Sequence, residues 1–142
     1  MSRKPPVVIA FHVVFTWLAI QFLAAGSLYV FAPDFAVEQF VKMGNGMPYG
    51  HAEDSVMWRV LAIANLATLS FCCAFIQFDV RRLFPVLYPL VVLKGIAAIG
   101  YGVAWFVERY PGHFNIFAID VATVAAMIYL ARAAAAAEPA KA

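Results

Sequence analysis

Long apolar segments dominate the sequence, and short polar stretches separate them. Four segments reach the length of about 20 residues that a helix needs to cross the hydrocarbon core of a bilayer. They cover residues 7–31, 55–78, 84–107 and 114–131. Their apolar positions are nearly continuous, whereas a membrane-spanning strand alternates apolar and polar residues. Because a backbone in lipid must satisfy its own hydrogen bonds, the pattern predicts an all-α fold, a bundle of four transmembrane helices in one domain over residues 1–142.

A different pattern lies between the first two spans. After Pro33, apolar residues recur at helical spacing around the charged residues Glu38 and Lys42, and the segment ends at Gly44. A short helix with one apolar and one polar face lies along the membrane surface rather than across the membrane. The pattern therefore predicts a short amphipathic interfacial helix in the first external loop.

The composition agrees with a membrane protein and narrows its function. Hydrophobic residues make up 65% of the chain and charged residues 13%, and the mean hydropathy is +0.83. So few charges exclude a nucleic-acid-binding domain and a disordered chain. The sequence contains no motif of a hydrolase, a nucleotide-binding protein or a zinc protease, which favours a non-enzymatic role.

The distribution of basic residues predicts the orientation of the chain. Loops on the cytoplasmic side of a membrane protein carry most of its Lys and Arg. Lys42 and Arg109 lie on the side of the first and third loops. The side of the termini and the second loop carries six basic residues, namely Arg3, Lys4, Arg81, Arg82, Arg132 and Lys141. We therefore expect both termini to be cytoplasmic.

Three ionisable residues, Arg59, Lys94 and Asp120, fall inside the predicted spans. Each costs about 2.5–3.5 kcal/mol to insert and therefore requires a partner. At 1.5 Å per residue, Arg59 lies roughly 6 Å and Asp120 roughly 9 Å below the outer surface, so these two can meet. Lys94 lies roughly 16–20 Å below that surface and reaches Asp120 only if the helices slide or bend. Pro85 and Pro89 permit such a bend.

Three interpretations of these charges stay open. In the first, Arg59 and Asp120 form a clamp between helices. Lys94 is then satisfied by carbonyls or by the side chains of Thr16, Gln21 or Asn65. In the second, two cations and one carboxylate leave a positive charge that suits an anionic or carbonyl-bearing ligand, such as a lipid headgroup or a quinone. In the third, a partner subunit supplies the missing acid.

Histidine and cysteine residues give weaker signals. His12, in the first span, is either a hydrogen-bonded core residue or an axial ligand of haem or chlorophyll. His51 and His113 lack the paired spacing of a zinc motif, so no metal site is predicted. The adjacent Cys72 and Cys73 are expected to pack as small apolar residues.

Small residues at a spacing of four predict which helix faces pack closely. One such pair is Ala98 and Gly102 in the third span, and the fourth span has the stripe Ala118, Ala122 and Ala126. We expect both faces to lie inside the bundle.

Four short motifs share a layout with a known family. They are Ala32-Pro33-Asp34, Met57-Trp58-Arg59-Val60-Leu61, Leu93-Lys94-Gly95 and Ala118-Ile119-Asp120-Val121. In this layout the chain resembles the DoxX-like group of small four-helix bacterial membrane proteins and its relatives of unknown function. The resemblance implies a multi-pass bundle in the bacterial cytoplasmic (inner) membrane. Some members of the group are linked to quinone-dependent sulfur oxidation or to redox partner complexes, and no catalytic residues are transferred.

These observations predict a small non-enzymatic membrane protein that is an accessory or scaffold subunit of a larger complex, of the respiratory or photosynthetic electron-transfer type. The alternative is a quinone- or lipid-binding redox component whose site contains Arg59, Lys94 and Asp120. The expected partners are membrane lipids and either other membrane subunits or further copies of the chain, with no nucleic acid. A quinone or a bound lipid is the candidate cofactor, ahead of haem or chlorophyll.

Overall fold

The computed structural model describes residues 5–45 and 56–137, without the side chains of residues 37, 40 and 56–59. The helices in these ranges are α1 (Pro6–Phe31), α2 (Pro33–Met43), α3 (Val56–Phe75), α4 (Leu87–Glu108) and α5 (Pro111–Ala137), with the 3-10 turns η1 (Ile76–Phe78) and η2 (Phe84–Val86). Neither described range contains a strand. Four helical segments are long and apolar enough to cross a membrane, namely Pro6–Phe31, Val60–Phe78, Phe84–Glu108 and Pro111–Ala137. The predicted all-α fold with four spans is confirmed, and the chain is a multi-pass membrane protein.

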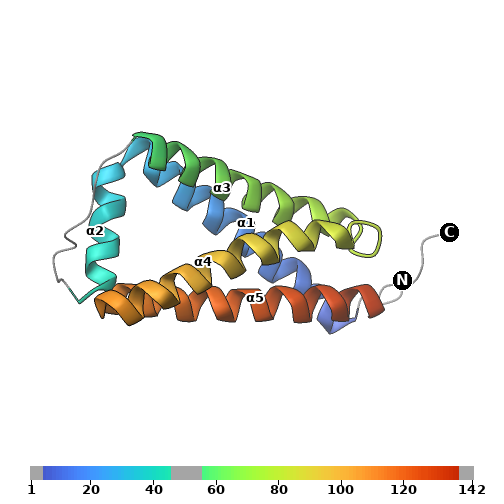
Figure 1. The fold of residues 1–142 in the computed structure, drawn as a ribbon. Coiled ribbons are helices and arrows are strands. Elements are labelled where there is room, and N and C mark those ends of the chain that lie inside the picture. Colours follow the sequence, from blue (N-terminus) through green and yellow to red (C-terminus); the bar gives the residue numbers. More distant parts are fainter. Residues whose placement is uncertain (1–4, 46–55, 138–142) are drawn as a thin grey trace.

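The helix α2 runs across the ends of the long helices instead of along them. It leads from the end of α1 to the turn between α4 and α5, as Figure 1 shows. Asp34 in its first turn and Lys42 in its last turn complement the helix dipole, and Lys42 Nζ lies 2.8 Å from a carboxylate oxygen of Glu38. The short helix predicted in the first loop is therefore present.

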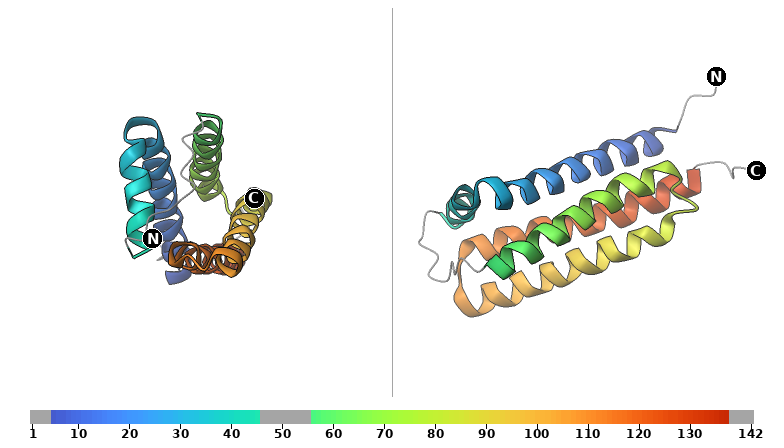
Figure 2. Two further views of the ribbon diagram at one scale, coloured as in Figure 1. Left: turned by 60° about the vertical axis from the view of Figure 1, so that its left-hand side comes forward. Right: turned by 90° about the horizontal axis from the view of Figure 1, so that it is seen from above.

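The four long helices form two pairs. In the first pair α1 packs along α3, and in the second α4 packs along α5; α1 also contacts α5, whereas α3 and α4 touch only slightly. The pairs converge towards η1 and η2 and spread apart towards α2 (Figures 1 and 2). We call the half with η1 and η2 the inner half and the half with α2 and the α4–α5 turn the outer half.

The apolar core lies in the inner half. Its buried members come from the first two thirds of α1, the end of α3, η1 and the turn after it, the start of α4 and the second half of α5. They are Val8, Phe11, Phe15, Leu18, Phe22, Leu69, Cys72, Cys73, Ile76, Val80, Leu87, Leu90, Met127, Ala131 and Ala134. The expectation that the two cysteines pack as apolar residues is confirmed.

The packing of small residues agrees with the prediction in α4 and differs from it in α5. Ala98 is buried, and a methyl group added at Gly102 would lie 3.3 Å from the ring of Phe117. In contrast, Ala118 and Ala122 are exposed, so the predicted packing face of α5 is wrong. The rotation of α5 about its own axis differs from the expected one. The helix turns another stripe towards the bundle, which is formed by Asp120, Met127, Ala131 and Ala134.

The connection between α4 and α5 is shorter than the sequence indicated. Arg109 takes a left-handed conformation with φ 57° and ends α4. The helix α5 then begins at Pro111, three residues before the predicted start of the fourth span. Proline is favoured at the first position of a helix, because its missing N–H would have no intrahelical partner there.

Candidate functional site

The ion pair between Lys94 and Asp120 is the main polar feature that the structure shows inside the bundle. Lys94 Nζ of α4 donates a hydrogen bond to Asp120 Oδ1 of α5 at 2.7 Å. The two side chains are 16% and 5% exposed. The ammonium group also lies 5.1 Å from the ring centroid of Phe22 on α1, within the range of a cation–π contact. Three helices therefore meet at this pair.

The start of α5 explains why these two residues meet. Because α5 begins at Pro111, Asp120 lies about 13.5 Å along it instead of roughly 9 Å. Lys94 lies about 21 Å from the outer end of α4, and its long side chain covers the remaining offset. The two prolines proposed as bend points lie at the inner start of this span, Pro85 in η2 and Pro89 in the first turn of α4, where proline does not interrupt a helix.

The third predicted charge, Arg59, belongs to the first turn of α3, but its side chain lies outside the described part of the chain. A contact between Arg59 and Asp120 therefore stays a prediction. The suggestion that Thr16 satisfies Lys94 is wrong, since Thr16 Oγ1 donates to Gln77 Oε1 at 2.9 Å. The partner of Lys94 in the structure is Asp120.

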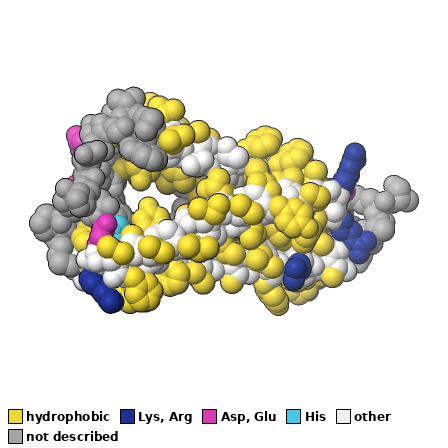
Figure 3. Space-filling model, viewed as in Figure 1, with side chains coloured by type: hydrophobic (Ala, Val, Ile, Leu, Met, Phe, Trp, Pro, Cys, Tyr) yellow, Lys and Arg dark blue, Asp and Glu magenta, His cyan; other side chains and the backbone are white. Residues whose placement is uncertain are grey.

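The pair lies at the edge of the apolar core. Leu90, one turn before Lys94 in α4, and Met127, two turns after Asp120 in α5, both belong to the core. Towards the α2 end, the space-filling view shows the molecule hollowed between the two helix pairs (Figure 3). We call this space the hollow.

Asn65 adds a polar group to the same region. It precedes Leu69 by four residues and Cys73 by eight, so it lies on the face of α3 that carries the core. Those two residues are buried, whereas Asn65 is exposed. The exposure of Asn65 shows that this level of α3 is covered less than the level of Leu69 and Cys73.

A second polar group lies at the outer ends of α4 and α5. His113 Nε2 is 2.8 Å from Glu108 Oε2, and the histidine side chain is 3% exposed while the glutamate side chain is 40% exposed. The ring of His113 lies 5.9 Å from that of Tyr101 and 5.3 Å from that of Tyr110, centroid to centroid. His113 is thus buried at the start of α5, while its partner Glu108 reaches the outer surface.

The end of α2 is fastened to the same corner. Asn115 Nδ2 donates to the backbone oxygen of Met43 at 2.9 Å. Tyr110 is buried, and its side chain lies against the backbones of both Gly44 and Gly112, which have no Cβ that would collide with it. We call this contact the α2 corner.

The proposed cofactor ligand His12 lies in the inner half, away from the hollow. Its Nδ1 is 3.4 Å from Gln77 Oε1, the same oxygen that accepts from Thr16. Gln77 Nε2 in turn donates to the backbone oxygen of Cys73 at 2.9 Å. This network supports the hydrogen-bonded interpretation of His12, and haem or chlorophyll ligation stays a prediction.

Sequence reasoning missed Gln77, Glu108 and Asn115 as members of polar contacts. Each is a polar residue at or near the end of an apolar span, where such residues are common and carry little signal by themselves. The closeness of Glu108 to His113 across the α4–α5 turn was the available hint. His51, the other histidine of the outer side, lies outside the described residues.

Comparisons of the chain with models of protein families, with curated proteins and with solved structures found no match.

Proposed function

We propose that this protein binds an amphipathic molecule of the lipid or quinone class in the hollow, with the Lys94–Asp120 pair contacting its polar head. The observation that carries the proposal is this buried ion pair at the edge of the apolar core, in a bundle that is hollowed at its α2 end. A lysine ammonium donates three hydrogen bonds, and Asp120 Oδ1 accepts one of them. A carbonyl or phosphate oxygen of a ligand is a suitable acceptor for another.

The burial of two charged side chains supports a ligand-binding role over a purely structural one. A buried ion pair adds little net stability, because the cost of removing both charges from water offsets their attraction. Ionisable residues inside transmembrane bundles therefore mark ligand or ion sites by default. Asn65, exposed on the core-facing side of α3, gives the hollow a further hydrogen-bonding group.

The proposal includes the setting of the protein. We place it in the cytoplasmic membrane of a bacterium with both termini in the cytoplasm, as a non-enzymatic binding component related to the DoxX-like group. The six-to-two distribution of basic residues supports the orientation. The outer half would then open towards the external leaflet.

The test is equilibrium binding by the purified full chain in mild detergent. A short-chain benzoquinone and a short-chain phosphatidylcholine are titrated separately, which distinguishes the two ligand classes. We expect one of them to bind, and Lys94→Met or Asp120→Asn to weaken it by about tenfold or more, the effect of losing a hydrogen bond to a charged group. The matched control is Ser70→Ala. It removes the 2.8 Å hydrogen bond from Ser70 Oγ of α3 to the backbone oxygen of Ala19 of α1, which does not involve the ion pair.

Two results would contradict the proposal. One is the absence of binding by the wild-type chain to either probe. The other is binding by the Lys94 and Asp120 variants that equals binding by the Ser70 variant, with helical content and elution volume unchanged in all of them.

A role as an accessory or scaffold subunit is the second candidate, favoured by the exposed Ala118 and Ala122. Small residues on an exposed face of a membrane helix allow the backbone of another helix to approach closely. Ala122→Leu should then reduce the amount of any partner subunit recovered with the chain from native membranes. Recovery of only the lone chain from those membranes would contradict this role.

A further inference from the structure

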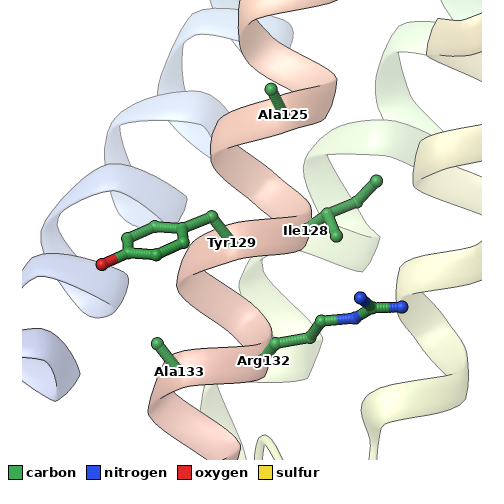
Figure 4. Close-up of a pocket in the computed structure, with 5 residues that line it drawn as sticks. All are labelled: Ala125, Ile128, Tyr129, Arg132 and Ala133. Carbon is green, nitrogen blue, oxygen red and sulfur yellow. The ribbon is translucent and has the colours of Figure 1, made fainter.

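The inner end of α5 carries a groove on the side that faces away from the bundle. It has a volume of about 520 Å³ and is lined by Ala125, Ile128, Tyr129, Arg132 and Ala133. Figure 4 shows Tyr129 and Arg132 extending to opposite sides of the helix. The buried residues of this part of α5 lie on its other face, so the groove faces the surroundings of the protein.

The groove forms because large and small side chains alternate on this face. Ala125 and Ala133 contribute only methyl groups, whereas Tyr129 is 69% exposed and stands out from the helix between them. Ala125 lies about 10 Å closer to the middle of the helix than Arg132. The groove is therefore apolar towards the membrane centre and cationic at its inner end.

The position of Arg132 matches the level of lipid headgroups. It lies about 32 Å along α5 from Pro111, close to the thickness of about 30 Å of a hydrocarbon core. A second guanidinium is held at the same level, because Arg81 Nε donates to the backbone oxygen of Ala135 at 2.6 Å. Arg132 thus lines the inner end of the groove, and Arg81 adds a second positive charge at a similar level of α5.

We propose that this groove binds an anionic phospholipid, and we call it the inner-end groove. The phosphate of the lipid contacts Arg132, with Arg81 adding positive charge, and an acyl chain lies over Ala125 beside Tyr129. A guanidinium presents paired N–H donors that match the oxygens of a phosphate. Tyrosine is common at this depth because its ring is apolar and its hydroxyl group forms hydrogen bonds.

This site is separate from the hollow. It lies in the other half of the molecule and on the outward face of α5, whereas Asp120 is on the inward face. It does not depend on which side of the membrane the termini occupy, since both leaflets have headgroups. The proposal therefore stands or falls independently of the ligand assigned to the hollow.

The test uses native mass spectrometry of the full chain exchanged into detergent with either phosphatidylglycerol or phosphatidylcholine. The wild-type chain should retain phosphatidylglycerol in preference to phosphatidylcholine. Arg132→Gln should reduce that preference by about fivefold, the effect of one arginine at a membrane surface. The control is Arg109→Gln, which removes an exposed cation at the outer end of α4 and should keep the preference.

A second pair of variants tests the groove itself. Ala125→Leu fills it, whereas Ala118→Leu adds the same bulk to an exposed position on α5 outside it. We expect Ala125→Leu to lower retention of phosphatidylglycerol and Ala118→Leu to leave it unchanged. Because Ala125 is exposed, its substitution leaves the packing of the bundle intact. This comparison therefore tests the groove even where Arg132→Gln yields no folded protein.

Several outcomes would overturn the proposal. Equal losses from the two arginine variants would mean that total charge alone attracts the lipid. Equal retention by the two leucine variants would mean that no acyl chain occupies the groove. A wild-type chain that retains the two lipids equally would show that the groove does not select an anionic phospholipid.

Discussion

The inner and outer halves of this bundle are made from the same four long helices, but they are held together differently. The inner half packs aromatic and aliphatic side chains such as Phe11, Phe15 and Leu90 into a closed core. The outer half is joined by the α2 corner and by polar contacts, and it contains the hollow. In a membrane, helices gain no hydrophobic advantage over lipid when they associate, so close packing and hydrogen bonds decide where they stay together.

The connections between helices contribute to this difference. In the inner half, η1 and η2 join α3 to α4 through a tight turn, in which Leu83 N donates to Asp79 O at 2.9 Å. This turn brings α3 and α4 together at one end only. In the outer half α2 reaches from α1 to α5, and it contacts both. The inner half is therefore closed by a short turn and an apolar core, whereas the outer half is linked by α2.

The largest expected effect is the loss of an aromatic side chain from the inner core. Phe15 is fully buried, and Phe15→Ala should lower the free energy of unfolding by about 3 kcal/mol or more. Ile20→Ala, on an exposed position of the same helix, should change it by well under about 1 kcal/mol. Reversible unfolding in mixed micelles measures both, and equal effects would refute the assignment of the core to this half.

The ion pair at the edge of the apolar core should give the next largest effect. Asp120→Asn leaves Lys94 buried without its carboxylate and should cost about 3 kcal/mol. The double change with Lys94→Met should cost less than the single one if this pair is the relevant contact. Rescue by Arg59→Gln instead would identify the other arrangement that the sequence suggested. The same unfolding measurement distinguishes these two results.

The α2 corner should respond to a single methyl group. Gly44→Ala places a Cβ against the buried Tyr110 and should lower stability by about 1–3 kcal/mol. Gly95→Ala is the matched control, because its added Cβ meets no heavy atom within 4 Å apart from its chain neighbours and the backbone of its own helical turns. A thermal shift as large in the control as at Gly44 would show that the corner does not hold the outer half.

The smallest expected effect on stability comes from cysteines that report the orientation of the two halves. Asn45→Cys should react with an impermeant thiol reagent added to intact cells, and Ala136→Cys should not. The wild-type chain provides the background, since Cys72 and Cys73 are buried in the inner core. The reverse labelling pattern would place the hollow on the cytoplasmic side.

The sequence alone determined the local elements of this protein. Continuous apolar segments of about 20 residues were enough to locate four spanning helices, and the mixed pattern around Glu38 was enough to locate α2. It also singled out Lys94 and Asp120 as costly residues that require partners. These properties depend on residues that are near one another in the chain, so they can be predicted without knowing the packing.

The tertiary structure decided which side chains meet. The start of α5 at Pro111 moved Asp120 deeper into the bundle and brought it to Lys94. The rotation of α5 exposed Ala118 and Ala122, and the spreading of the two helix pairs left Asn65 exposed on a core-facing side of α3. Helical periodicity predicts which residues share a face. The direction in which that face points, and the level at which two helices meet, depend on contacts between segments far apart in the chain.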